Sequence, residues 1–113
     1  MPYKNPEAAK AAKARHYQKN KALYLGKAQE ARQVREQYVF DLKSTTACVD
    51  CNTIYHPCQM QYDHINDDKV ASVSDLIRYS TLAAVKLEIS KCELVCANCH
   101  MMRTWLRKSK HIL

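Results

Sequence analysis

Polar and apolar positions change period twice along the chain, and these changes divide it into three parts. Residues 6–40 are rich in Ala, Lys, Arg, Glu and Gln, which predicts one long helix. Asn5-Pro6-Glu7 is a typical helix start, with Asn as the cap and Pro at the first helical position. Residues 41–47 read as a connector, and a compact domain follows from about 48 to 108.

Short elements with different periods succeed one another inside this compact part. Residues 60–65 (MQYDHI) alternate as a strand does, whereas 74–80 and 82–89 have a helical period, with Ser74 as the expected cap of the first. Leu94-Val95 lead into a C-x-x-C turn, and a last helix is expected over 98–107. The predicted fold class is α+β.

Aromatic residues recur at multiples of seven in the long helix, at Tyr3, Tyr17, Tyr24 and Tyr38, with Ala31 in the same register. This spacing predicts a stripe on one helix face that docks on the small domain or on a partner helix. The stripe is too sparse to predict a coiled coil, and it leaves a homodimer open.

Length and composition limit the size of the core. A chain of 113 residues holds one domain with an extension, here residues 1–47 before 48–113. With one Phe and one Trp, the core needs additional stabilisation such as a bound metal. No run of eighteen apolar residues exists, which excludes a membrane span, and no apolar leader is visible, so we expect a cytoplasmic protein.

Charge is distributed unevenly over these parts. The formal net charge is +7, yet residues 1–37 carry nine Lys/Arg against three Glu (+6), while 48–102 carry four Lys/Arg against seven acids (−3). Basic segments around a near-neutral centre suit a polyanionic partner, nucleic acid first, although a solvated charged helix explains the charge equally well. The expected phosphate contacts are Arg15, Lys19, Arg32, Arg35, Arg103 and Arg107.

Four of the six cysteines form two C-x-x-C pairs, Cys48–Cys51 and Cys96–Cys99. Two such turns offer four thiolates to one tetrahedral zinc ion, so we predict a structural zinc site with four cysteine ligands. A disulfide framework and a redox C-x-x-C are the weaker alternatives. We expect the remaining Cys58 and Cys92 to be small buried hydrophobic residues.

A second group of chemically active residues surrounds the zinc turns. Asp63-His64 ends the predicted strand, and His100 directly follows Cys99. Four thiolates saturate the zinc, which leaves Asp63 and His100 for a second metal ion. Neighbouring strand residues point to opposite faces, so Asp63 and His64 need a local distortion, or an ion at the strand end, to act together. A buried structural His64, or His100 as a zinc ligand, are the alternatives, and Trp105 and Leu106 are expected in the core.

The order C-x-x-C, then Y-D-H-I, then K-C-E-L-V-C-A-N-C-H-x-x-R-T resembles the HNH endonuclease family, especially its small phage- and prophage-encoded members. The resemblance covers about residues 48–107. It implies a ββα-metal fold, a two-stranded hairpin and a helix around one divalent ion, with a structural zinc knuckle. The basic, Tyr-containing N-terminal segment is similar to segments found in such phage proteins, though this match is less specific.

The resemblance also implies roles for individual residues. His64 corresponds to the general base, Asp63 and His100 to ligands of a catalytic Mg²⁺ or Mn²⁺, and Arg103 is expected near a phosphate. The implied reaction is DNA hydrolysis to 5′-phosphate and 3′-hydroxyl ends, by nicking or double-strand cutting.

One position departs from the family pattern, because Lys91 stands where the family has its middle Asn. That Asn often orients the loop that carries the base, so what orients His64 is open, with Asp68, Lys69 or a backbone carbonyl as candidates. A non-catalytic zinc-knuckle module that binds nucleic acid is the alternative function.

Overall fold

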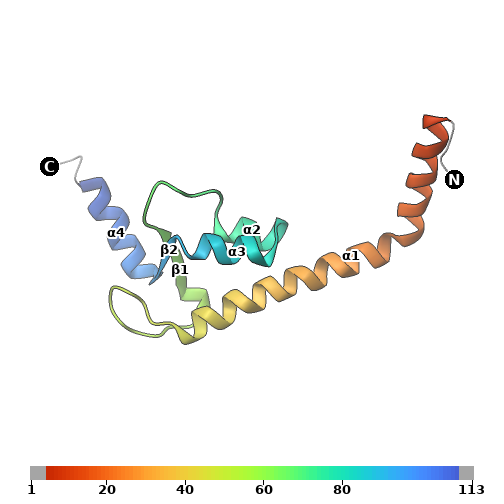
Figure 1. Ribbon diagram of the computed structural model, residues 1–113. Helices are drawn as coiled ribbons and strands as arrows, with labels where there is room; N and C mark the ends of the chain where they lie inside the picture. The colour runs from red at the N-terminus through yellow and green to blue at the C-terminus, as the bar shows by residue number, and fades with distance from the viewer. Residues whose placement is uncertain (1–4, 110–113) are drawn as a thin grey trace. The chain divides into compact units, whose positions relative to one another are not determined.

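A computed structural model describes residues 5–109, and contacts divide the chain into two units, Met1–Ala31 and Arg32–Leu113. Helix α1 (Pro6–Thr45) contributes to both units. Figure 1 shows the elements that follow it: β1 (Met60–His64), α2 (Val73–Tyr79), α3 (Leu82–Ile89), β2 (Cys92–Cys96) and α4 (Ala97–Ser109). The predicted α+β class is confirmed at this level.

Helix α1 begins at the predicted residue, Pro6, and ends at Thr45, five residues beyond the predicted end at residue 40. The Asn5 side chain accepts a hydrogen bond from the Glu7 N–H at 2.9 Å, as a helix cap does. At the other end, the hydroxyls of Ser44 and Thr45 donate to the carbonyls of Phe40 and Asp41. The helix therefore includes most of the predicted connector, and these two hydroxyls bond to carbonyls of the helix itself.

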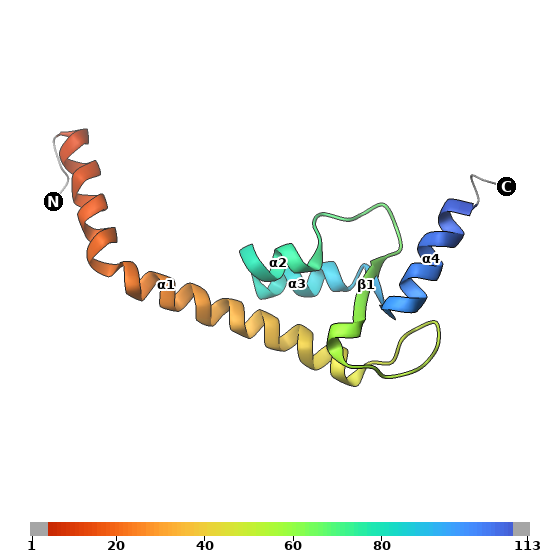
Figure 2. The ribbon, with the colours of Figure 1, turned by 180° about the vertical axis from the view of Figure 1, so that it is seen from behind.

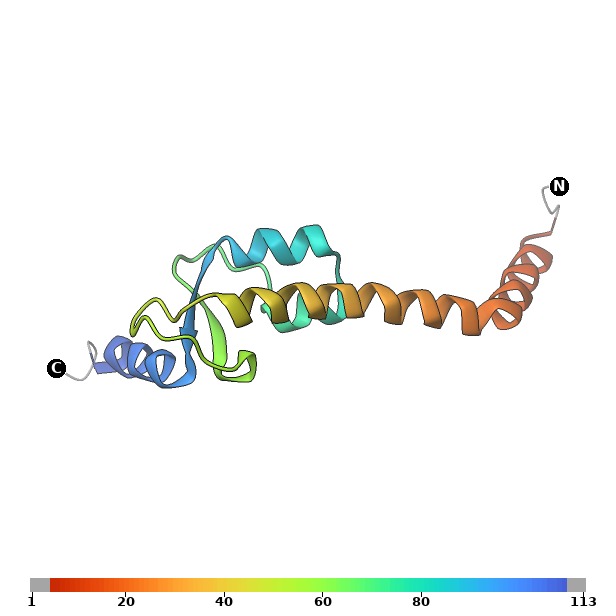
Figure 3. The same ribbon diagram turned by 90° about the horizontal axis from the view of Figure 1, so that it is seen from below.

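Strands β1 and β2 form one antiparallel pair in which Met60 faces Cys96 and His64 faces Cys92. They are not joined by a tight turn, because α2 and α3 lie between them in the chain. The sheet lies between α4 and the α2–α3 pair, which can be followed in Figures 2 and 3. The second zinc turn therefore leads directly from the sheet into α4.

The two short helices are capped by hydroxyl side chains. Thr81 caps α3 by accepting from the Ala84 N–H. The cap of α2 is Ser72 and not Ser74, since the Ser72 hydroxyl accepts from the Asp75 N–H at 3.1 Å. The predicted cap was wrong by two residues because Ser74 already lies inside the first turn.

Two small clusters of buried side chains form the core. One gathers around the sheet and both zinc turns: Cys48, Met60, Leu94, Val95 and Cys96. The other joins α1 to the inserted helices through Val39, Val73 and Val85. The compact unit thus begins at Arg32, earlier than residue 48, where the sequence places the second domain.

Three residues expected in the interior lie on the surface. Trp105 and Leu106 are 62% and 51% exposed, because α4 turns its charged residues Arg103 and Arg107 toward the sheet. Cys58 is also exposed, in a 3-10 turn that begins at Pro57, whereas Cys92 is half-buried.

The tyrosines of the predicted stripe differ in how far they are buried. Tyr17 and Tyr24 stack on each other with ring centroids 6.0 Å apart and remain exposed, whereas Tyr38 packs on the Val39–Val85 cluster. Tyr3 lies outside the described residues.

Candidate functional site

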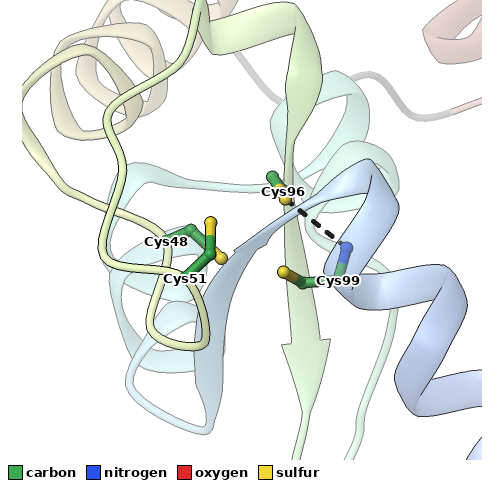
Figure 4. Close-up of side chains that lie close together, drawn as sticks. All are labelled: Cys48, Cys51, Cys96 and Cys99. Carbon is green, nitrogen blue, oxygen red and sulfur yellow. Dashed lines mark hydrogen bonds between the residues drawn. The ribbon is translucent and has the colours of Figure 1, made fainter.

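The four paired cysteines converge on one point, as Figure 4 shows. Their sulfur atoms all lie within 4.8 Å of one another, although the two pairs come from turns 44 residues apart in the chain. Zinc–sulfur bonds of about 2.3 Å in a tetrahedron place the sulfurs about 3.8 Å apart, so the observed limit of 4.8 Å exceeds the zinc spacing by only about 1 Å. The cysteines therefore fit a structural metal ion such as zinc.

Backbone hydrogen bonds shape both turns of this cluster. The Cys48 N–H donates to Thr53 and the Asn52 N–H donates back to Cys48, which closes the first turn. Asn52 has a φ of 57°, a left-handed conformation that Asn tolerates better than most residues. In the second turn the Cys99 N–H points at the Cys96 sulfur, at 3.4 Å.

The thiols of the cluster cannot all ionise without a cation beside them. A hydrogen bond from the Tyr55 hydroxyl lowers the pKa of Cys51 to about 6. Hydrogen bonding to Cys96, together with burial and the neighbouring thiols, raises the pKa of Cys99 to about 12. This separation of pKa values is the behaviour of crowded like charges, which a divalent ion relieves.

Asp63 lies on the sheet face that α4 covers and is 4% exposed. Its two oxygens accept from Arg107 at 3.0 and 2.6 Å and from Arg103 at 2.9 Å. The bonds from Arg107, and then those from Arg103, hold the pKa of Asp63 at about 2. Asp63 is therefore an ionised carboxylate, strongly paired with cations.

Arg103 links α4 to three carboxylates. Asp63 and Glu93 face each other directly across the strands, an arrangement that destabilises a sheet unless a cation neutralises it. The Arg103 Nη1 lies 2.9 and 3.1 Å from these two acids. Its Nε and Nη2 form a bidentate pair with Asp50, between the first two cysteines, at 2.6 Å each. The phosphate contact predicted for Arg103 has to compete with all three.

His100 follows the zinc turn and reaches the same carboxylate. Its Nδ1 bonds the Gln61 side-chain oxygen, which leaves the lone pair on Nε2, and Nε2 lies 3.4 Å from the Asp63 Oδ1. Three hydrogen bonds occupy Asp63, and a carboxylate has about four acceptor positions. The remaining position is on Oδ1, the oxygen of Asp63 that lies nearest to His100.

His64 lies on the opposite face of the sheet from Asp63. Strand β1 stays regular through His64, which pairs with Cys92, so of the two arrangements that would let Asp63 and His64 act together, the local distortion is absent. The His64 Nε2 lies 2.7 Å from the Oε2 of Glu88, an acid of α3 that the sequence analysis missed. The orienting partner of His64 is thus a carboxylate rather than Asp68, Lys69 or a backbone carbonyl.

A pocket of about 300 Å³ runs along β1 and is lined by side chains from both sheet faces. His64 and His100 both line it, together with Lys43 and Lys69. Two serines, Ser72 and Ser74, add hydroxyl groups to a predominantly polar wall. His64 and His100 therefore line the same polar pocket.

The predicted DNA contacts differ in how they are placed. Arg15 and Lys19 are exposed in the first unit, and Arg32 is exposed but paired with Glu36 at 2.7 Å. Arg35 differs from the prediction, because it is buried and donates to the carbonyl of Ile77 at 2.7 Å. Arg107 is half-exposed beside Asp63.

No family model, curated protein or solved structure matches this chain. Within residues 5–109, no helix has the length and apolarity that crossing a membrane requires.

Proposed function

We propose that this chain is a metal-dependent DNA endonuclease of the HNH type, with a ββα-metal site formed by β1, β2 and α4. The observation that supports the proposal best is the shared pocket, which is lined by His64, His100 and two lysines. Two cationic side chains suit a phosphodiester, and a neutral imidazole suits proton transfer near neutral pH.

In the proposed reaction, the pocket residues and the neighbouring Asp63 have different roles. His64 takes a proton from water as the water oxygen bonds to phosphorus and the bond to the 3′ oxygen breaks. Lys43 and Lys69 attract and orient the phosphate. A divalent ion held by Asp63 and His100 would stabilise the negative charge on the phosphate and on the departing oxygen. The departing 3′ oxygen takes a proton from solvent water, so the products are a 5′-phosphate and a 3′-hydroxyl.

One observation favours the second candidate, a zinc module that binds nucleic acid without cutting it. Asp63 is so fully paired with Arg103 and Arg107 that a purely structural role explains its burial. In that case the zinc cluster and the basic helix carry the whole function.

End analysis of a labelled DNA duplex separates the two candidates. Zinc-loaded protein with Mg²⁺ or Mn²⁺ should give 5′-phosphate and 3′-hydroxyl ends, and His64→Ala should give none while keeping its zinc. His56→Ala is the matched control, since the His56 side chain accepts a hydrogen bond from the Cys58 N–H and lies outside the pocket. Equal cutting by His64→Ala would refute the proposed base.

A further inference from the structure

Glu88 is the most deeply buried acid among the described residues, with 2% of its surface exposed. Each of its oxygens has a partner: Oε2 accepts from the Val70 N–H at 3.1 Å and lies 2.7 Å from the His64 Nε2, and Oε1 accepts from the Lys91 ammonium at 3.0 Å. A buried carboxylate is costly unless it is paired in this way. The set of partners therefore fixes where Glu88 points.

Lys91 holds this carboxylate and the loop that follows β1. Its ammonium donates to the backbone carbonyl of Asp68 at 2.9 Å as well as to Glu88. The Val70 N–H, from the same loop, also donates to Glu88. The loop from β1 to α2 is thus held by two hydrogen bonds, one from its Val70 N–H to Glu88 and one from Lys91 to its Asp68 carbonyl.

The charge state of Glu88 is set by these neighbours. Burial alone would raise its pKa, but the hydrogen bonds from Lys91, His64 and the Val70 N–H outweigh burial and lower the pKa to about 2. An ionised carboxylate accepts hydrogen bonds and donates none. The His64 nitrogen that faces Glu88 must therefore carry a hydrogen, which leaves Nδ1 as the acceptor of the neutral ring.

We infer that Glu88 is the positioning residue of His64, fixing its Nε2–H tautomer and ring orientation so that Nδ1 takes the proton from water, with Lys91 holding Glu88 in place. The inference rests on the proposed nuclease function for the reaction, and on geometry alone for the tautomer. The inference also explains Lys91, which stands where the family resemblance expects Asn, as the residue that holds Glu88 in place.

Glu88→Gln tests the inference because it keeps the shape and removes the charge. The single amide oxygen of Gln can accept either from the Lys91 ammonium or from the Val70 N–H and His64, so the charge-assisted contact with His64 is weakened or lost. Long-range ¹H–¹⁵N NMR of the zinc-loaded full chain, with His64→Ala for assignment, should show Nε2–H in the wild type and a smaller Nε2–H fraction in Glu88→Gln.

Cleavage kinetics provide the second readout. Loss of an orienting partner typically costs about 10–100-fold, and here the loss should fall on kcat while KM for DNA stays within about twofold. Glu88→Asp, which keeps the charge, should recover part of kcat. Glu36→Gln, an exposed acid paired with Arg32, is the matched control and should behave as wild type.

Each outcome has a distinct meaning. A wild-type His64 in the Nδ1–H form, or a Glu88→Gln variant that keeps both tautomer and kcat, overturns the inference. A wild type that never cuts DNA overturns the proposed function, and with it the positioning of a base, even where NMR shows the contact. Should Glu88→Gln fail to fold, as judged by zinc content, Glu88→Asp and Lys91→Gln carry the same comparison, and unchanged kcat in both overturns the inference.

Discussion

Replacing Arg103 by alanine should destabilise the zinc-loaded protein without weakening its affinity for DNA. The guanidinium of Arg103 is bonded to Asp50, Asp63 and Glu93 at distances between 2.6 and 3.1 Å. Its removal leaves three carboxylates close together on one sheet face and the adjoining zinc turn, with Arg107 as the remaining cation bonded to Asp63.

The expected loss is intermediate between those of buried and exposed ion pairs. Removing one partner of a fully buried pair costs about 3–5 kcal/mol, whereas an exposed pair contributes about 0–1 kcal/mol. Asp63 is buried, but Asp50 and Glu93 are 35% exposed and therefore screened by water. We expect Arg103→Ala to lower the free energy of unfolding by about 2 kcal/mol.

Urea denaturation at pH 7 in excess zinc, followed by circular dichroism, measures this loss. Arg103→Lys should recover less than half of it, because an ammonium cannot form the bidentate pair with Asp50. Arg107→Ala is the matched control: Arg107 is half-exposed and should cost about 1 kcal/mol or less, while reducing the salt dependence of DNA binding by about one phosphate contact.

Unchanged stability together with weaker DNA binding would contradict this structural role of Arg103. If Arg103→Ala unfolds within about 0.5 kcal/mol of wild type, a change typical of neutral surface positions, while its DNA affinity falls severalfold, Arg103 contacts phosphate as the sequence predicts. Its bonds to the three carboxylates would then be incidental.

Three further predictions concern the zinc site, the basic helix and the core. Cys96→Ser, or a zinc chelator added to the wild type, should remove one zinc ion per chain and unfold the sheet, as seen by metal analysis and circular dichroism; a folded zinc-free protein would contradict this. Arg15→Gln with Lys19→Gln should lower the salt slope of DNA binding by about two, and an unchanged slope would assign the helix to another partner. Val85→Ala, at a fully buried position, should cost about 2 kcal/mol in urea denaturation, against less than about 0.5 for the exposed Val70→Ala, and equal losses would show that the Val39–Val85 cluster is not a core.

The sequence predicts best where one local signal decides the structure. The two C-x-x-C pairs come together as predicted, because two such turns can offer four sulfur ligands to one metal ion. Helix α3 matches its predicted range, since an apolar period and the cap Thr81 agree there. The end of α1 was missed because Ser44 and Thr45, common in loops, bond back to the helix instead.

Predictions failed where distant charges decide what faces inward. Trp105 and Leu106 look like core residues by hydropathy, yet α4 covers a sheet face that carries Asp63 and Glu93. Pairing these acids with Arg103 and Arg107 turns the apolar side chains of α4 outward. A hydropathy pattern holds no information about which sheet face the helix will cover.

Glu88 was missed for a related reason. It lies 24 residues from His64 and sits in a short helix, where an acid usually faces solvent. Its one local signal is Lys91, three residues later, which also reads as a surface pair. Only the packing of α3 against the sheet makes this acid the partner of the candidate base.

Conversion of a supercoiled plasmid is the most direct test of the proposed nuclease activity and of His64 as its base. Zinc-loaded wild-type protein is incubated with the plasmid and Mg²⁺ or Mn²⁺, beside His64→Ala at the same concentration. The account predicts nicked or linear product from the wild type and none from His64→Ala with equal zinc content. No conversion by wild-type protein that is folded, zinc-loaded and still binds DNA would contradict it and leave a zinc module that binds nucleic acid.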